Sequence, residues 1–307
     1  MGEYTTQELI SIFAMQGFAG FSLFSVLLLM ALGLAIIFGQ MGVINMAHGE
    51  FMAVGAYTTY LMSAMSEKYF PGFIQYYFVF AIIASFFIAG FLGYLAELAL
   101  IRHLYKRPLD TLLATWGLSL IMQQSFRSIF GAREVSPTLP EWLLGSYQPT
   151  DTIDIPLNGL FVLGLTLVIT LGVFILMYRS SWGLRVRATT QNRVMSGAVG
   201  INTKKVDRLT FALGCGIAGI AGAAFTTIAS TGPTIGSLYI VDTFMVVVFG
   251  GAGSLFGTIA SAFSIAQAQS ILEFFISGSM AKVITLLTIV VFLMLRPEGL
   301  FASKVRK

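Results

Sequence analysis

Long uninterrupted apolar runs most constrain the fold of this 307-residue chain. Clear runs cover residues 18–38, 74–101, 109–130 and 157–178, and a helix needs roughly 20 residues to cross a bilayer. Lipid allows only helices or closed β-barrels to span it, because every backbone polar group must be satisfied internally. The runs lack the alternation of barrel strands. The sequence therefore predicts an all-α, polytopic membrane protein that forms one transmembrane domain over residues 1–307.

Composition narrows the classes of site that the chain can carry. The chain is 56% hydrophobic and 10% charged, and its one cysteine, Cys215, excludes a disulfide framework or a thiolate cluster. Its two histidines, His48 and His103, are too few for a metal site without help from carboxylates. No metal site and no catalytic residue is predicted.

The basic residues are gathered in three places, and this sets the expected topology. Fourteen of the 18 lysines and arginines lie in residues 102–107, 179–208 and 296–307. Basic loops stay on the cytoplasmic side, which puts these segments and the C-terminus inside. Residues 131–156 are mainly acidic and suit the outer face. This distribution reflects topology and does not indicate nucleic-acid binding. Eight or nine crossings are expected, and the count is ambiguous because two segments are broken.

Two apolar segments are interrupted by glycine and proline, one in each half of the chain. They cover residues 39–50 and 232–257, and their break glycines are Gly39, Gly42, Gly49, Gly250, Gly251 and Gly253. Paired breaks of this kind indicate a midplane binding site in transporters built from inverted repeats. Since no residue-level repeat is visible, an inverted repeat is predicted from the break positions alone.

Polar residues at the first break form one candidate pathway site. Asn45 is expected to cap a helix that begins there, and the helix start would favour a carbonyl oxygen or an anion. At 100° per residue Asn45 and His48 share a face, while Glu50 points nearly opposite His48. The three residues therefore do not form one catalytic cluster. They either line a solute pathway or serve as cap, packing and gate groups.

Asp242 and Thr243 are the corresponding candidates in the second break. Both are expected to begin a short second helix. Asp242 either caps that helix or faces the pathway, where its carboxylate could accept N–H groups from a solute.

The basic segment 179–208 is a candidate docking surface. Residues 188–198 can form a short amphipathic helix that Gly200 ends, and Asn202 offers a cap for the next helix. The residues expected to contact a partner are Ala188, Gln191, Asn192, Arg193, Met195 and Gly200. The alternative is an ordinary positive-inside loop.

Two nucleotide-binding motifs are considered next. The chain has no P-loop motif, so any ATP must be hydrolysed elsewhere. The G-x-G-x-x-G pattern at residues 214–219 lies in an apolar helix and is interpreted as a helix-packing stripe.

Five segments together resemble one family. They are INMAHGEFMAVGAY, LLATWGLSLIMQQ, GLRVRATTQNRVMSGAVGINTKKVDRLTFALG, DTFMVVVFGGAGSLFGT and RPEGLF, in order over about residues 18–302. This combination resembles the permease subunits of ABC importers for branched-chain amino acids. Within that family, the ATWG and RATTQNR segments resemble the urea-transport permease.

The resemblance implies a multi-pass permease in a bacterial inner membrane. It also implies a second related permease subunit, two cytoplasmic ATPase subunits that use ATP and Mg, and a periplasmic binding protein, with no cofactor in this chain. Residues 188–200 would then be the coupling helix. The resemblance of the ATWG and RATTQNR segments makes urea the expected substrate, and a branched-chain amino acid is the alternative. If urea is the substrate, Asp242 or Asn45 could accept its N–H donors.

Two other classes of protein are weighed against the importer. An intramembrane enzyme would use His48, Glu50 or Asp242, but the opposed directions of His48 and Glu50 argue against a paired acid and base. An ATP-independent channel or ion-coupled carrier would not need a basic segment with a helix, a terminating glycine and a following cap. The importer is therefore the main prediction.

Overall fold

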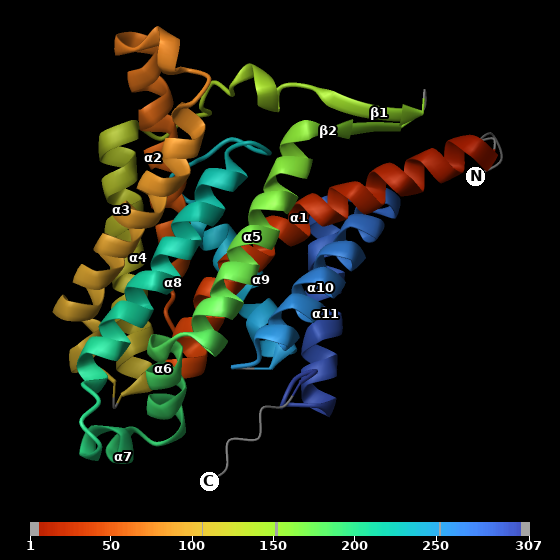
Figure 1. Cartoon of the computed structure of the whole chain (residues 1–307). Helices are drawn as coiled ribbons and strands as arrows, with labels where there is room; N and C mark the ends of the chain where they lie inside the picture. Colours follow the sequence, from red (N-terminus) through yellow and green to blue (C-terminus); the bar gives the residue numbers. More distant parts are fainter. Residues whose placement is uncertain (1–5, 106, 151–152, 252, 302–307) are drawn as a thin grey trace.

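The computed structural model describes residues 6–105, 107–150, 153–251 and 253–301 of the chain (Figure 1). These residues are mostly helical, and one short β-hairpin and three 3-10 turns complete the fold. The helices are α1 (Thr6–Met41), α2 (His48–Tyr69), α3 (Tyr77–Ala99), α4 (Pro108–Phe130), α5 (Leu157–Arg179), α6 (Ser181–Gln191), α7 (Arg193–Ala198), α8 (Thr203–Phe225), α9 (Ile235–Gly250), α10 (Leu255–Phe275) and α11 (Gly278–Leu295). The 3-10 turns are η1 (Pro71–Phe73), η2 (Ile101–His103) and η3 (Glu141–Leu143), and the strands are β1 (Ser146–Thr150) and β2 (Ile153–Pro156).

The predicted all-α, polytopic membrane class is confirmed. Within the described residues, six helices are long and apolar enough to cross a membrane: α1, α3, α5, α8, α10 and α11. Helices α2 and α4 have 22 and 23 residues but are more polar. Helix α9, with 16 residues, is too short to cross alone. The lower count than expected comes from these three helices, whose polar residues or short length belong to the site described below.

Helix α8 lies at the centre of the bundle, and its small residues allow close packing on three sides. A Cβ atom at Gly214 would lie 2.6 Å from the carbonyl oxygen of Gly33 on α1, and one at Gly216 would lie 2.7 Å from the Phe86 ring on α3. On the third side, a Cβ at Gly55 of α2 would overlap the carbonyl oxygen of Gly219. The interpretation of residues 214–219 as a helix-packing stripe is confirmed.

The two ends of the bundle differ in charge and in structure. The basic end carries η2, α6 and α7, and the opposite, acidic end carries the β1–β2 hairpin (Figure 1). In the hairpin Ser146 pairs antiparallel with Pro156, and an isolated bridge joins Val135 to Thr231. The hairpin lies in the segment predicted as an outer loop. The basic C-terminal residues 302–307 lie outside the described residues.

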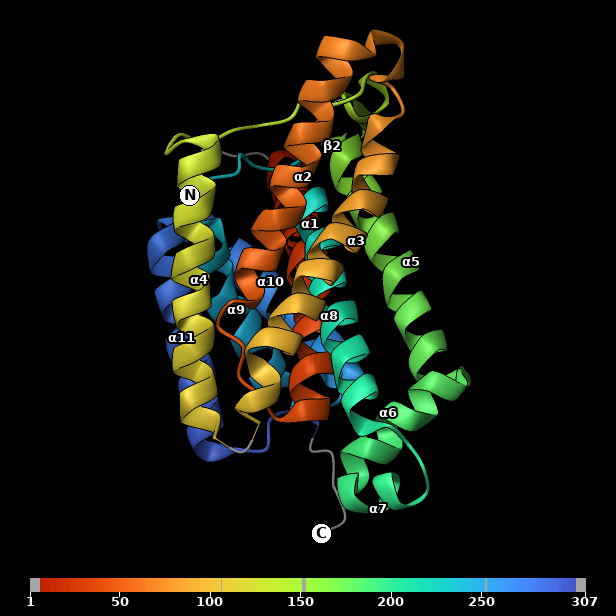
Figure 2. The same cartoon turned by 90° about the vertical axis from the view of Figure 1, so that its left-hand side faces the viewer.

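Helix α4 stands at the side of the bundle and packs mainly on α2 (Figure 2). Its apolar contact with α2 is aromatic, with the Tyr57 ring 4.2 Å from the Phe130 centroid and 5.0 Å from that of Phe126. Such pairs contribute about 0.5–1.5 kcal/mol beyond area burial. The rest of the contact is polar and forms part of the candidate site.

Candidate functional site

The starts of two helices from opposite halves of the chain meet inside the bundle. Helix α2 begins at His48 after the non-helical residues 42–47, and α9 begins at Ile235. A Cβ atom at Gly49 would overlap the carbonyl oxygen of Gly236, so the two backbones are in direct contact. From this point α2 runs to the acidic end, while α9 ends beside Leu300, whose N–H donates to the Phe249 carbonyl 2.8 Å away (Figures 1 and 2). The two broken segments are therefore arranged in opposite senses.

A second glycine contact joins the same two segments near the basic end. A Cβ atom at Gly39 would lie 2.8 Å from the Cα of Gly253. Gly39 itself is still helical, and the break begins at Gly42, whose φ is +62°. Gly251 and Gly253 have φ of +96° and +89°, values that L side chains rarely adopt. Gly250 in turn packs on the backbone of α10, because a Cβ there would lie 2.5 Å from the Gly257 carbonyl oxygen.

Asn45 does not cap α2 as predicted. Its Oδ1 accepts the Ala47 N–H at 3.1 Å, and the His48 N–H donates to the Asn45 carbonyl at 3.3 Å. The prediction of a cap is wrong because Asn side chains also bind the N–H two residues on in a turn. The chain makes that turn first, and the helix begins three residues later than predicted. Asn45 is 1% exposed, and its Nδ2 has no hydrogen-bond partner among the described residues.

His48 and Glu50 point to different neighbours, which agrees with the predicted helical geometry. His48 Nε2 lies 3.2 Å from the Met30 carbonyl of α1, whereas Glu50 Oε1 accepts from Ser119 Oγ at 2.9 Å and Gln123 Nε2 at 2.8 Å on α4. Both side chains are 0% exposed. His48 Nδ1 and Glu50 Oε2 have no hydrogen-bond partner in the described part of the chain. This arrangement leaves polar atoms of both side chains unpartnered within the described residues, and it does not assemble an acid and base on one atom.

The α4 side of this site was missed by the sequence reasoning. Thr115 Oγ1 accepts the Met46 N–H at 3.1 Å, one turn before Ser119. A visible signal exists, because polar residues recur every fourth position along an otherwise apolar helix and so share one face. That stripe is Thr111, Thr115, Ser119 and Gln123.

Asp242 lies in the middle of α9 and does not begin a helix, so the cap prediction is wrong. The helix begins seven residues earlier because the breaking residues Gly232 and Pro233 precede it directly. Asp242 Oδ2 accepts from Lys282 Nζ on α11 at 2.9 Å. Thr243 is buried, and its hydroxyl donates to the Tyr239 carbonyl at 2.7 Å.

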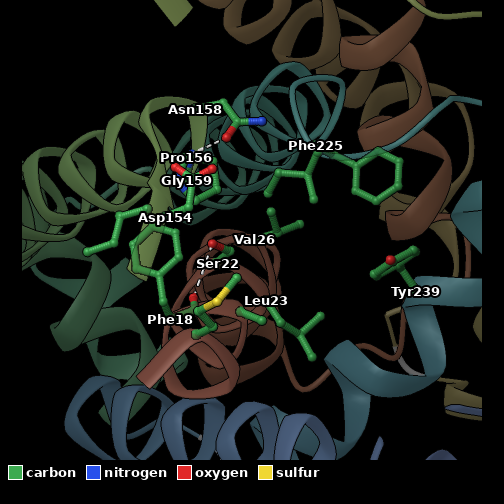
Figure 3. A pocket seen from close by; sticks show the side chains of 14 residues that line it. Phe18, Ser22, Leu23, Val26, Asp154, Pro156, Asn158, Gly159, Phe225 and Tyr239 are labelled. Carbon is green, nitrogen blue, oxygen red and sulfur yellow. Dashed lines mark hydrogen bonds between the residues drawn. The ribbon is translucent and has the colours of Figure 1, made fainter. Parts of the chain in front are cut away.

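A cavity of about 460 Å³ opens near the acidic end of the bundle (Figure 3). Its walls come from α1, β2, the start of α5, the end of α8 and Tyr239 of α9. Apolar groups such as Phe18, Val26 and Phe225 predominate, and Asp154 lies at the β2 edge. Asn158, also in the wall, donates from Nδ2 to the Thr227 carbonyl at 2.6 Å. The cavity therefore suits a group that is mostly aliphatic.

The predicted single helix over residues 188–198 is divided in two. Helix α6 ends at Gln191 and contains Ala188, while α7 begins at Arg193. Asn192 separates them because its Oδ1 accepts the Met195 N–H at 2.9 Å and so caps a new helix. Gly200 follows with φ +88°, and Asn202 caps α8 as predicted, accepting the Lys205 N–H at 3.1 Å.

Helix α7 presents apolar side chains at the basic end of the bundle. Val194, Met195 and Val199 are 86%, 61% and 70% exposed, and they lie outside the six candidate spans. Clustered apolar groups outside the membrane mark interaction surfaces. Gln191 and Asn192 are also exposed, so α7 and the end of α6 form one outward surface.

Comparison with known proteins identifies relatives over almost the whole chain. The family described as branched-chain amino acid transport system / permease component matches residues 17–293. The high-affinity branched-chain amino acid transport system permease protein LivH of Salmonella typhimurium is 26% identical over 293 residues, covering 94% of this chain and 95% of that protein. BraD of Pseudomonas aeruginosa is 24% identical over 92% and 93% of the two chains, and LivM of Escherichia coli is 25% identical over 89% and 67%. No solved structure matches the chain.

Proposed function

Because the chain belongs to the branched-chain amino acid transport permease family, we propose that it is the membrane permease subunit of an ABC importer. Two partner ATPase subunits, using ATP and Mg, drive the cycle, and one of them docks on α7 and the end of α6 of this chain. The observation that carries this proposal is the exposed apolar surface of Val194, Met195 and Val199 outside the spans. An ordinary positive-inside loop or a channel has no need of such a surface.

A second related permease subunit is part of the proposed assembly. This chain is similar to both LivH and LivM of Escherichia coli, two different permease proteins named for one transport system. A periplasmic binding protein would deliver the solute to the acidic end, where the cavity opens. In the proposed assembly the chain lies in a bacterial inner membrane with its basic end in the cytoplasm, which the positive-inside rule supports.

The solute pathway is proposed to pass the meeting point of α2 and α9. Asn45, His48 and Glu50 each keep a buried polar atom there that has no hydrogen-bond partner among the residues the structure describes, and a solute could satisfy these atoms. Asp242 and Thr243 belong to the same pathway on the α9 side. Importer permeases need only a weak, transient site, so a few polar groups are sufficient.

A branched-chain amino acid is the proposed substrate. The relatives' names support it, and so does the cavity, because burying an aliphatic side chain among Phe18, Val26 and Phe225 is favourable by roughly 25 cal/mol per Å². Urea is the second candidate, favoured by the ATWG and RATTQNR segments at residues 114–117 and 187–193. Urea would gain little from this cavity, since its donors need polar partners.

Uptake in a strain without this chain separates the two substrates. Labelled leucine and labelled urea are followed side by side at low concentration, before and after the gene is restored. Loss of leucine uptake alone supports the main proposal. Loss of urea uptake alone replaces the substrate but keeps the importer. Unchanged uptake of both solutes contradicts both candidates.

The docking surface is tested separately with Met195→Asp and the matched variant Ser181→Asp at the exposed start of α6, the end away from α7. A charge at Met195 should prevent co-purification of the ATPase subunits, whereas Ser181→Asp should leave it intact. Gly200→Pro is expected to uncouple ATP hydrolysis from uptake, because proline cannot adopt φ +88°. Normal copurification and coupled uptake in both Met195→Asp and Gly200→Pro would remove the basis for the proposed docking site.

A further inference from the structure

A buried carboxylate connects the docking helix to the first broken segment. The Arg193 guanidinium of α7 forms an ion pair with Asp207 of α8. The Asp207 side chain is 0% exposed and that of Arg193 is 43% exposed. The other carboxylate oxygen of Asp207, Oδ1, accepts a hydrogen bond from Gln40 Nε2 of α1 at 3.4 Å. Asp207 therefore lies between the surface of α7 and the interior of the bundle.

Gln40 is placed at the position where α1 stops being helical. It lies in the last turn of α1, two residues before Gly42 and its φ of +62°. Its neighbour Gly39 packs directly on the backbone of Gly253 in the second broken segment. A displacement of Gln40 therefore acts on both broken segments.

The Arg193 side chain is held from a second direction. Its guanidinium lies 5.3 Å from the Tyr105 ring centroid, and the Tyr105 hydroxyl donates to Glu97 Oε1 at 2.7 Å. Burial and then the Glu97 carboxylate raise the pKa of Tyr105, so its phenol stays a donor. Arg208 lies 3.4 Å from Glu97 and so completes a charged cluster at the basic end. Arg193 is thus held by both Asp207 and Tyr105, and a movement of α7 must break these contacts.

We infer that Asp207 and Gln40 are positioning residues that transmit motion of α7 to the broken segments. This inference rests on the proposed importer function. A carboxylate that is removed from water requires a partner. If the docked ATPase pulls α7 and Arg193 away, the Gln40 amide is the side-chain partner that Asp207 keeps among the described residues, and the start of α8 and the end of α1 must readjust. Neither residue contacts solute in this role.

The measurement is the amount of solute imported per ATP hydrolysed. The transporter is purified with its native ATPase subunits, reconstituted in liposomes and supplied with loaded binding protein. Asp207→Asn and Gln40→Ala should each lower the ratio at least about fivefold, the lower end for coupling between sites. The double variant should be no worse than Asp207→Asn, because residues in one chain of contacts are not additive. Arg193→Lys, which keeps the charge, should retain more coupling than Arg193→Gln.

Asp110→Asn is the matched control, because Asp110 is 49% exposed and pairs with Arg107, away from α7. A wild-type ratio in Gln40→Ala, or additive losses in the double variant, would overturn the relay even if Asp207→Asn assembles poorly. Failure of the proposed function looks different, since wild-type ATP hydrolysis would then not respond to loaded binding protein. If the wild type and every variant import the same amount of solute per ATP hydrolysed, the relay is rejected and the proposed importer function stands.

Discussion

The two broken segments bring their helix starts together but treat their carboxylates differently. Glu50, in the first turn of α2, is 0% exposed, and its described partners are the neutral side chains of Ser119 and Gln123. Asp242, in the middle of α9, is 18% exposed and is paired with Lys282. Helix starts favour negative charge, and the Glu50 carboxylate lies beside Gly236, the second residue of α9. The first segment thus keeps an acidic group that has no ion-pair partner among the described residues, whereas the carboxylate of the second is already paired with Lys282.

The largest effect is expected from Gly49→Ala at the contact between the segments. Its Cβ would overlap the Gly236 carbonyl, which belongs to backbone and cannot rotate away. The expected loss of stability is about 3 kcal/mol, the upper end for overpacking, and thermal unfolding of the purified protein measures it. Gly117→Ala on α4 is the control, because its added Cβ would have no described atom within 4 Å apart from its chain neighbours and its own helix backbone. Equal unfolding temperatures for the two variants would show that the helix starts do not touch.

Glu50→Gln tests whether the acidic group without an ion-pair partner matters. The glutamine oxygen can still accept from Ser119 and Gln123, so the fold should persist while the carboxyl group is lost. Initial uptake should fall by about tenfold, equivalent to about 1.4 kcal/mol, with unfolding temperature nearly unchanged. Initial uptake by the Asp242→Asn variant should fall by less, because this substitution removes a charge that Lys282 already neutralises. If Asp242→Asn had the larger effect, the roles assigned to the two segments would be reversed.

Asp242→Ala and Glu273→Ala sharpen the comparison on the second segment. Asp242→Ala is expected to weaken uptake more, because Asp242 lies on α9 in the proposed pathway. Glu273 lies on α10 and accepts from Gln269 of its own helix at 3.1 Å. Transport kinetics of the two variants at equal expression provide the measurement. Equal losses would leave Asp242 with a structural role only.

The smallest effect is expected from Lys282→Met on the stability of the second segment. The Lys282 and Asp242 side chains are 42% and 18% exposed, so water screens the pair and its contribution should be about 1 kcal/mol or less. A double-mutant cycle with Asp242→Asn, read by thermal unfolding, isolates this term. A much larger coupling energy would mean that the second segment also depends on its charge.

Several features of the fold could be predicted because they depend on local sequence. Apolar runs located α4 and α5 to within about a residue of their ends, and Asn202 capped α8 as its side chain favours. Local rules also caused the errors. Asn45 and Asp242 look like caps, but a turn and an earlier helix start decide their roles.

The contacts that make the site could not be predicted, because they join residues far apart in the chain. Glu50 meets Gln123 across 73 positions, and Gln40 meets Asp207 across 167. One sequence contains no record of which helix faces are neighbours. The polar stripe on α4 could have been noticed, but its partner on α2 could not.

The glycine contacts described above also bear on how easily the two halves of the chain can move. Interlocked side chains resist sliding, because each must leave its well-packed position before the next is reached. At Gly49 on Gly236 and at Gly39 on Gly253, smooth backbone touches smooth backbone. One of these contacts lies inside the bundle and the other near the basic end. Because no side chains interlock at either contact, the helices can rotate against each other there without side-chain repacking. The energy barrier to such a rotation would then come from the polar contacts around the glycines.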